Sequence, residues 1–221
     1  MMNFQELVNE LETAGFYDAV PKETRVAVKQ EILRTKFLYP DAVSRSFSAD
    51  AEDLAERGAL EFIAEVAPRL AKHGVHIPVI AFKLKPRNTR DPATGEINEV
   101  IPTVLRVDDS IPDPAGITHL RPATEDLPDS GDYYRITIGS RTQEIWNTEM
   151  APEKMWEAGM CHTFLLVNQL LEAAHAAERL YGLYGGNDGL AVFLTPDQFD
   201  LIHNCPDIQA SEKPWAPYKV S

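Results

Sequence analysis

The sequence predicts an α+β fold in which a helical N-terminal third packs on a largely antiparallel sheet with a central amphipathic helix. Apolar residues recur at helical spacing through residues 1–74. Strand-like segments joined by short turns, with one long helical pattern between them, fill residues 75–221. We therefore expect a helical region over residues 1–74 and an α+β body over residues 75–221, together forming one compact domain.

The first third of the chain is predicted to be entirely helical. Three segments carry apolar residues at helical spacing: 3–14, 21–38 and 49–72. Gly15 and Pro40 end the first two, because glycine favours helix ends and proline cannot continue a helix. Gly58 is a point where the third segment can divide, and Pro68 is expected to kink it.

The middle of the chain changes to strand-like patterns. Residues 75–84 and 100–107 predict two strands of an antiparallel ribbon. The segment 108–132 is rich in proline and acidic residues and is expected to be long and mostly irregular, a kind of segment that is usually functional or mobile. Alternating apolar residues then predict a hairpin over 133–146, with Gly139-Ser140 at its turn.

Residues 158–177 predict the central amphipathic helix. One arc of the helix is mostly apolar: Met160, Thr163, Phe164, Leu166, Val167, Leu170, Leu171 and Ala174. The opposite arc is mostly polar: Cys161, His162, Asn168, Gln169, Glu172 and His175. This division predicts one face toward the sheet and one toward solvent.

A second hairpin and a short helix follow the central helix. Two apolar runs, 180–184 and 190–194, flank a Gly/Asn/Asp turn at 185–189, a composition typical of hairpins. Thr195, Pro196 and Gln198 then form a helix start with a capping box.

Charge and composition narrow the function classes. The formal net charge is −13, which disfavours binding to nucleic acid or to an anionic membrane surface and allows a basic protein partner. We find neither an apolar run of membrane-spanning length nor a signal-peptide pattern at the N-terminus. The two cysteines cannot supply a disulfide framework, so we expect a cytoplasmic protein with reduced thiols.

The cysteines and histidines do not form a recognisable catalytic motif in the sequence. Cys161 and His162 are adjacent, but neighbours on a helix point about 100° apart, so His162 is poorly placed to activate the Cys161 thiol. The six histidines form no metal-binding motif, and a site using His203 and Cys205 would need further ligands. We therefore predict no metal and no cofactor.

Exposed turns and acidic segments supply the candidate binding residues. Those predicted to contact a partner are Asn187, Asp188, Asp108, Asp109, Asp113 and Trp215. Trp215 lies in a proline-rich tail, where it either folds back onto the domain or contacts a partner. A further acidic cluster, Asp50 to Glu56, fits the first turn of a helix and could also provide paired carboxylates.

Three functions follow as hypotheses. The first is a soluble acidic binding or inhibitory protein, analogous in composition to bacterial immunity proteins that cover a basic toxin. The second is a hydrolase that uses Cys161 or the clustered carboxylates. The third is a structural or assembly subunit whose N-terminal helices form a homo-oligomer face.

Overall fold

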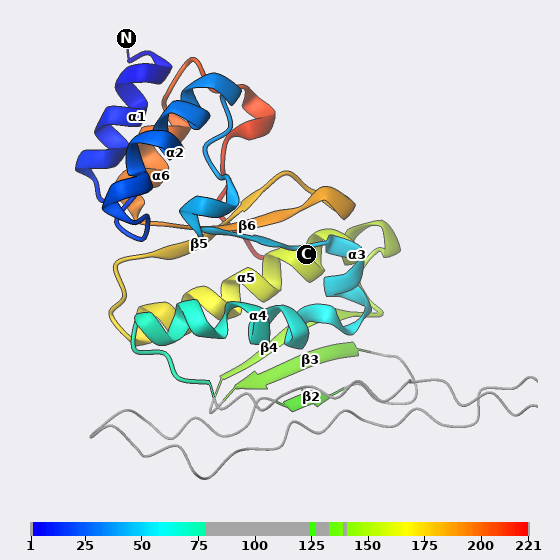
Figure 1. Cartoon of the computed structure of the whole chain (residues 1–221). Helices are drawn as coiled ribbons and strands as arrows, with labels where there is room; N and C mark the ends of the chain where they lie inside the picture. The colour runs from blue at the N-terminus through cyan, green and yellow to red at the C-terminus, as the bar shows by residue number, and fades with distance from the viewer. Residues whose placement is uncertain (1, 78–123, 127–132, 139–140, 221) are drawn as a thin grey trace, which may run out of the picture.

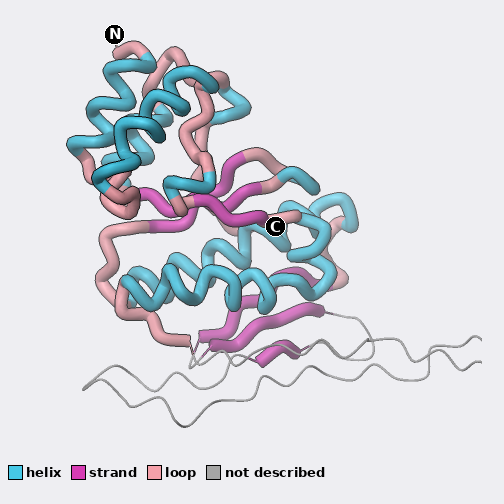
Figure 2. Tube along the Cα trace, in the orientation of Figure 1, coloured by secondary structure: helices cyan, strands magenta, loops and turns pink. Residues whose placement is uncertain are grey.

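Helices and sheets alternate in layers through the described part of the protein (Figure 1; Figure 2). The computed structural model describes residues 2–77, 124–126, 133–138 and 141–220. The helices are α1 (Phe4–Thr13), α2 (Lys22–Thr35), α3 (Ala51–Asp53), α4 (Ala59–Lys72), α5 (Met155–Ala173) and α6 (Pro196–His203). The strands are β1 (Ser46–Ser48), β2 (Thr124–Asp126), β3 (Tyr133–Ile138), β4 (Arg141–Asn147), β5 (Arg179–Leu183) and β6 (Leu190–Leu194). Short turns of helix are η1 (Asp41–Val43), η2 (Leu54–Gly58), η3 (Pro152–Lys154), η4 (Gly186–Asp188) and η5 (Ala210–Glu212).

The described strands form two sheets, with strand orders β1-β6-β5 and β2-β3-β4, and every pairing among them is antiparallel. The predicted α+β class is confirmed, as are both predicted hairpins, β3–β4 and β5–β6. The predicted capping box also forms. Thr195 Oγ1 accepts from the backbone N–H of Gln198, and Gln198 Oε1 accepts from the backbone N–H of Thr195.

Both faces of the β1-β6-β5 sheet are buried, each in a different hydrophobic core. Along β6, Ala191 and Phe193 belong to a lower core, and Val192 and Leu194 belong to an upper core. This division follows from the alternation of side chains along a strand. Helices α1, α2 and α6 cover the upper face, and α4 and α5 cover the lower face (Figure 1). The apolar run in β6 therefore reflects a strand enclosed on both sides.

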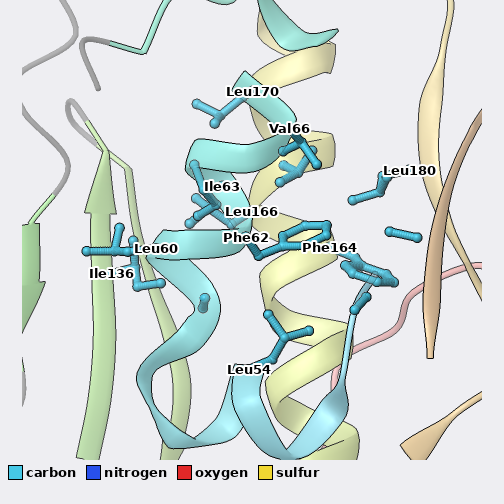
Figure 3. Packing of buried hydrophobic residues seen from close by; sticks show 14 of the residues in the cluster. Leu54, Leu60, Phe62, Ile63, Val66, Ile136, Phe164, Leu166, Leu170 and Leu180 are labelled. Carbon is cyan, nitrogen blue, oxygen red and sulfur yellow. The ribbon is translucent and has the colours of Figure 1, made fainter. Parts of the chain in front are cut away.

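The lower core lies around α4 and α5, between the two sheets. The rings of Phe62 on α4 and Phe164 on α5 face each other with centroids 5.6 Å apart (Figure 3). Ile136 from β3 and Leu180 from β5 reach this core from opposite sides (Figure 3). Each such buried side chain stabilises the fold by roughly 1.5–3 kcal/mol.

A buried ionic network joins the segments around the β1-β6-β5 sheet. The carboxylate of Glu178, just before β5, accepts hydrogen bonds from three side chains. The donors are Arg45 Nη1 at 2.5 Å, Arg69 Nη2 at 2.7 Å and His73 Nε2 at 2.8 Å. Arg45 also donates from Nε to the carbonyl of Phe16 at 2.7 Å, so the network reaches the N-terminal helices. Burial alone would raise the pKa of Glu178, but the Arg69 hydrogen bonds and the Arg45 charge hold it below the ordinary value.

Helix α5 differs from its prediction in how much of it is buried. The predicted polar arc includes Cys161 and His162, yet these side chains are only 1% and 4% exposed. The second sheet covers that side, and His162 Nδ1 donates to the Ile145 carbonyl of β4 at 2.7 Å. Only the C-terminal end follows the predicted pattern, with Glu172 exposed. The helix ends before the predicted residue 177, because His175 has a left-handed backbone conformation, with φ 53°.

The prediction that the first third is entirely helical is wrong, since Ser46–Ser48 pairs with β6 as β1. Three residues are too few to show a strand period. The segment 108–132, predicted to be mostly irregular, contains the short strand β2, which pairs with β3. In the third predicted helix, the split falls at η2, a π-helical turn, and α4 continues through Pro68.

Several predictions lie wholly or partly outside the described residues. They are the strand at 100–107, most of the strand at 75–84, most of the loop at 108–132 and the Gly139-Ser140 turn. The division into residues 1–74 and 75–221 stays a prediction. In the structure, α1 and α2 contribute to the upper core, while α3 and α4 contribute to the lower core.

Candidate protein-binding groove

An acidic groove lies where β1 leads into α3, η2 and α4. Its volume is about 380 Å³. The described residues that line it are Ser48, Ala49, Asp50, Asp53, Leu54, Glu56, Gly58, Glu61, Phe62 and Glu65. Five of these described residues carry carboxylates, and the other five carry no charge. We call this feature the acidic groove.

Local helix chemistry places the carboxylates of the acidic groove. Asp50 is the N-cap of α3, and its Oδ1 accepts from the backbone N–H of Glu52 at 2.8 Å. The following π-helical turn η2 carries Glu56. Glu61 and Glu65 are four residues apart on α4, so they share one face of that helix. The result is a row of carboxylates along one continuous helical segment.

The helix α5 fixes the position of η2. A Cβ atom at Gly159 would lie 2.7 Å from the backbone nitrogen of Ala55, so only glycine permits this approach of the two backbones. Trp146 Nε1 of β4 donates to the Ala55 carbonyl at 2.8 Å. The rim of the acidic groove is therefore attached to both the central helix and the second sheet.

The predicted binding residues Asn187 and Asp188 lie beside this segment. Both are exposed on η4, in the turn between β5 and β6. Asn187 Nδ2 donates to Oε2 of Glu52 at 3.2 Å. The backbone N–H of Ala49 also donates to the carbonyl of Gly189 at 2.9 Å. Folding thus places the predicted hairpin tip next to the acidic cluster that begins at Asp50.

Trp215 folds back onto the domain, which is one of its two predicted alternatives. Its backbone forms a bridge with Gly182 at the free edge of β5, with N···O distances of 2.8 and 2.9 Å. The indole stacks on Phe164 at a centroid distance of 6.0 Å and donates to the Tyr184 carbonyl at 3.0 Å. Trp215 is not among the described residues that line the acidic groove.

The remaining predicted residues, Asp108, Asp109 and Asp113, lie outside the described residues. Conversely, Glu61 and Glu65 were not among the predicted site residues. The sequence pattern could have indicated them. A spacing of four residues on a predicted helix places both side chains on the face opposite the buried Ile63 and Val66.

Cys161 and His162 are buried, and their contacts are those of residues that stabilise the fold. Burial raises the pKa of the Cys161 thiol, which favours the unreactive protonated form. His162 donates from Nδ1 to the Ile145 carbonyl and accepts from the backbone N–H of Val220 at Nε2, 3.0 Å away. Both ring nitrogens are therefore engaged, Nδ1 as a donor and Nε2 as an acceptor.

Within the ranges that the structure describes, no group of three or more His, Cys, Asp or Glu side chains could hold a metal ion. None of the helices described in this chain has both the length and the apolar character needed to cross a bilayer. The chain matches no protein-family model, no curated protein and no solved structure.

Proposed function

We propose that this protein binds a basic protein partner through the acidic groove. The observation that carries the proposal is the arrangement of Asp50, Asp53, Glu56, Glu61 and Glu65 around one groove. A surface of this kind attracts a positively charged partner and speeds their encounter. The net charge of −13 supports the same kind of partner.

The groove also suits the side chains that such a partner presents. Leu54 and Phe62 also line the groove, but they are only 2% and 5% exposed, so the carboxylates are the side chains that a partner would meet there. Lysine and arginine each carry a cationic head at the end of a long stem, so their charges can reach the carboxylates of the groove. Arginine can further form paired hydrogen bonds with a carboxylate. The exposed Asn187 and Asp188 extend the proposed contact surface beyond the groove itself.

The proposal includes an inhibitory role in the cytoplasm, by analogy with acidic immunity proteins that cover a basic toxin. Cys161 and Cys205 are both unpaired, which agrees with a reducing compartment. The hydrolase hypothesis gains no support from Cys161, because its thiol is buried and has a raised pKa. The described contacts likewise provide no observation that favours the assembly hypothesis.

The test is affinity capture with charge-reversed variants. The wild-type protein is immobilised and exposed to an extract of the cells that produce it, and bound proteins are identified by mass spectrometry. Glu56→Lys/Glu65→Lys reverses two exposed carboxylates of the groove. We expect a basic protein to bind wild type and to be lost from this variant, because like charges oppose each other across an interface.

The matched control is Glu10→Lys/Glu23→Lys, on α1 and α2. It changes the net charge by the same amount on exposed side chains of the upper helices. Retention of the basic protein by this control would assign the effect to the groove. Failure to capture any basic protein, or equal losses in both variants, would contradict the proposal.

A further inference from the structure

The hydroxyl group of Tyr39 is buried without a hydrogen-bond partner among the described residues. The Tyr39 side chain is only 3% exposed, and it follows α2 in the chain. The rings of Phe16 and Phe37 both contact its ring edge to face, which fixes its position. A buried hydroxyl ordinarily has a partner, either a protein group or an ordered water molecule.

A small cavity borders Tyr39, with a volume of about 10 Å³. A cavity of this size has room for one water molecule and for nothing larger. Leu38, Leu183 and Ile208, all buried, form the apolar part of its wall. A water molecule is retained in such a cavity when about two to four polar groups hold it.

Two other polar side chains meet Tyr39 at this cavity: Tyr184, just after β5, and Glu212, in η5. Burial raises the pKa of both tyrosine hydroxyls, and the negative charge of Glu212 raises both further. The carboxylate therefore lies near both hydroxyls. A carboxylate accepts hydrogen bonds, whereas a tyrosine hydroxyl can donate and accept, so these groups can satisfy both the protons and the oxygen of a water molecule.

The backbone at two sides of the cavity has a conformation that is unusual for its residue types. Lys36 and Tyr184 have φ angles of 63° and 59°, in the left-handed region. Non-glycine residues held in this way concentrate at ligand-binding and other functional sites. The ammonium group of Lys36 lies over the ring of Phe4, 4.4 Å from its centroid. We therefore assign the polar contacts of the cavity to Tyr39, Tyr184 and Glu212.

We propose that this cavity is a binding site for one internal water molecule that bridges Tyr39 and Glu212. The Tyr39 hydroxyl donates to the water, and the water donates to a carboxylate oxygen of Glu212, with the Tyr184 hydroxyl as a further partner. The bridge joins the segment after α2 to η5. This inference is independent of the proposed partner of the acidic groove.

Tyr39→Phe tests the bridge, because it removes the hydroxyl oxygen and leaves the ring in place. Equilibrium unfolding in urea is measured on the full-length protein. The folding equilibrium constant should fall about fivefold, because the variant loses a hydrogen bond to the water. The loss of an unpartnered hydroxyl would have the opposite effect or none, because such a group destabilises the folded state.

Tyr17→Phe is the matched control. The Tyr17 side chain is 1% exposed, and its hydroxyl also lacks a partner among the described residues. Tyr17 is, however, not among the described residues that line this cavity. Tyr17→Phe should therefore leave the folding equilibrium constant unchanged or raise it.

Glu212→Ala shows whether the water connects the two side chains. The fold-loss that it causes should be about threefold smaller in the Tyr39→Phe background than in the wild type, because the bridge is already broken there. The water itself is observed in a crystal structure of the wild-type protein. It should appear as ordered density about 2.7–3.0 Å from both the Tyr39 hydroxyl and a carboxylate oxygen of Glu212.

The proposal is overturned if Tyr39→Phe is as stable as the wild type, or if Tyr39→Phe and Tyr17→Phe cause equal losses. Additive losses in Tyr39→Phe and Glu212→Ala would overturn it as well. A crystal structure without density at this position, or with a direct hydrogen bond between Tyr39 and Glu212, would do the same. If Tyr39→Phe fails to fold, the crystal structure of the wild-type protein decides the question without it.

Discussion

Asn187 donates from Nδ2 to Oε2 of Glu52 at 3.2 Å, although 135 residues separate the two in the chain. This contact joins the tip of the β5–β6 hairpin to the acidic segment that begins at Asp50. The two features were separate candidates in the sequence. Their meeting places the hairpin tip beside the acidic segment that leads to α4, and we propose that both contact the partner.

The close approach of α5 and η2 predicts a strong effect of one added methyl group. Gly159→Ala should lower the free energy of unfolding by about 1–3 kcal/mol, because its Cβ would meet the backbone of Ala55. Urea unfolding followed by circular dichroism measures this loss. Gly185→Ala is the control, since its Cβ meets no described atom within 4 Å and its backbone is extended. Equal losses at the two positions would contradict this account of the groove.

The buried ionic network predicts a large loss of stability when its carboxylate is neutralised. Glu178→Gln leaves the Arg45 and Arg69 charges buried without their anion, so unfolding should become easier by about 3–5 kcal/mol. Equilibrium unfolding in urea at neutral pH provides the measurement. Glu172→Gln, an exposed change on α5, should alter stability by less than about 0.5 kcal/mol. A loss this small in Glu178→Gln would show that the network is dispensable.

The lowered pKa of Glu178 predicts a specific dependence on pH. A carboxyl group with a folded pKa below its ordinary value of 4.5 contributes stability above that value and loses the contribution as pH falls through the folded pKa. The stability difference between wild type and Glu178→Gln should therefore be largest above pH 4.5 and shrink at lower pH. Unfolding curves between about pH 6 and about pH 3 measure it. A constant difference over this range would contradict the assignment.

The contact between Gly182 and Trp215 predicts strong coupling between these positions. A Cβ atom at Gly182 would lie 2.1 Å from Cζ2 of the indole, so Gly182→Ala should displace Trp215 from the edge of β5. In a Trp215→Leu background the same change should cost much less. A double-mutant cycle by urea unfolding should give a coupling of about 0.5–3 kcal/mol. Additive effects of the two substitutions would show that the position of the Trp215 indole does not require glycine at 182.

The sequence predicted those elements whose signals are local. The β5–β6 hairpin and the start of α6 depend on Gly185 to Gly189 and on Thr195 with Gln198, residues close together in the chain. The strand β1 could not be predicted in this way. Its three residues become a strand because β6 offers a free edge, which is a tertiary effect.

Burial of Cys161 and His162 shows a second limit of local patterns. On the helical wheel they belong to the polar arc, but cysteine packs as a small apolar residue, and His162 is satisfied by Ile145 and Val220. The second sheet creates these partners, and a wheel does not include it. The acidic groove was partly predictable, since Asp50 to Glu56 was a candidate, whereas its junction with Asn187 required the fold.

The central claim is that the acidic groove recognises a basic protein by complementary charge. Its most direct test is the association rate of the captured partner, measured by stopped flow at about 0.01 M and about 0.15 M salt. For wild type and Glu10→Lys/Glu23→Lys, we expect the rate to fall by roughly tenfold or more over this range. For Glu56→Lys/Glu65→Lys, the rate should be low at both salt concentrations. A rate that is independent of salt, or equally fast in the groove variant, would contradict the claim.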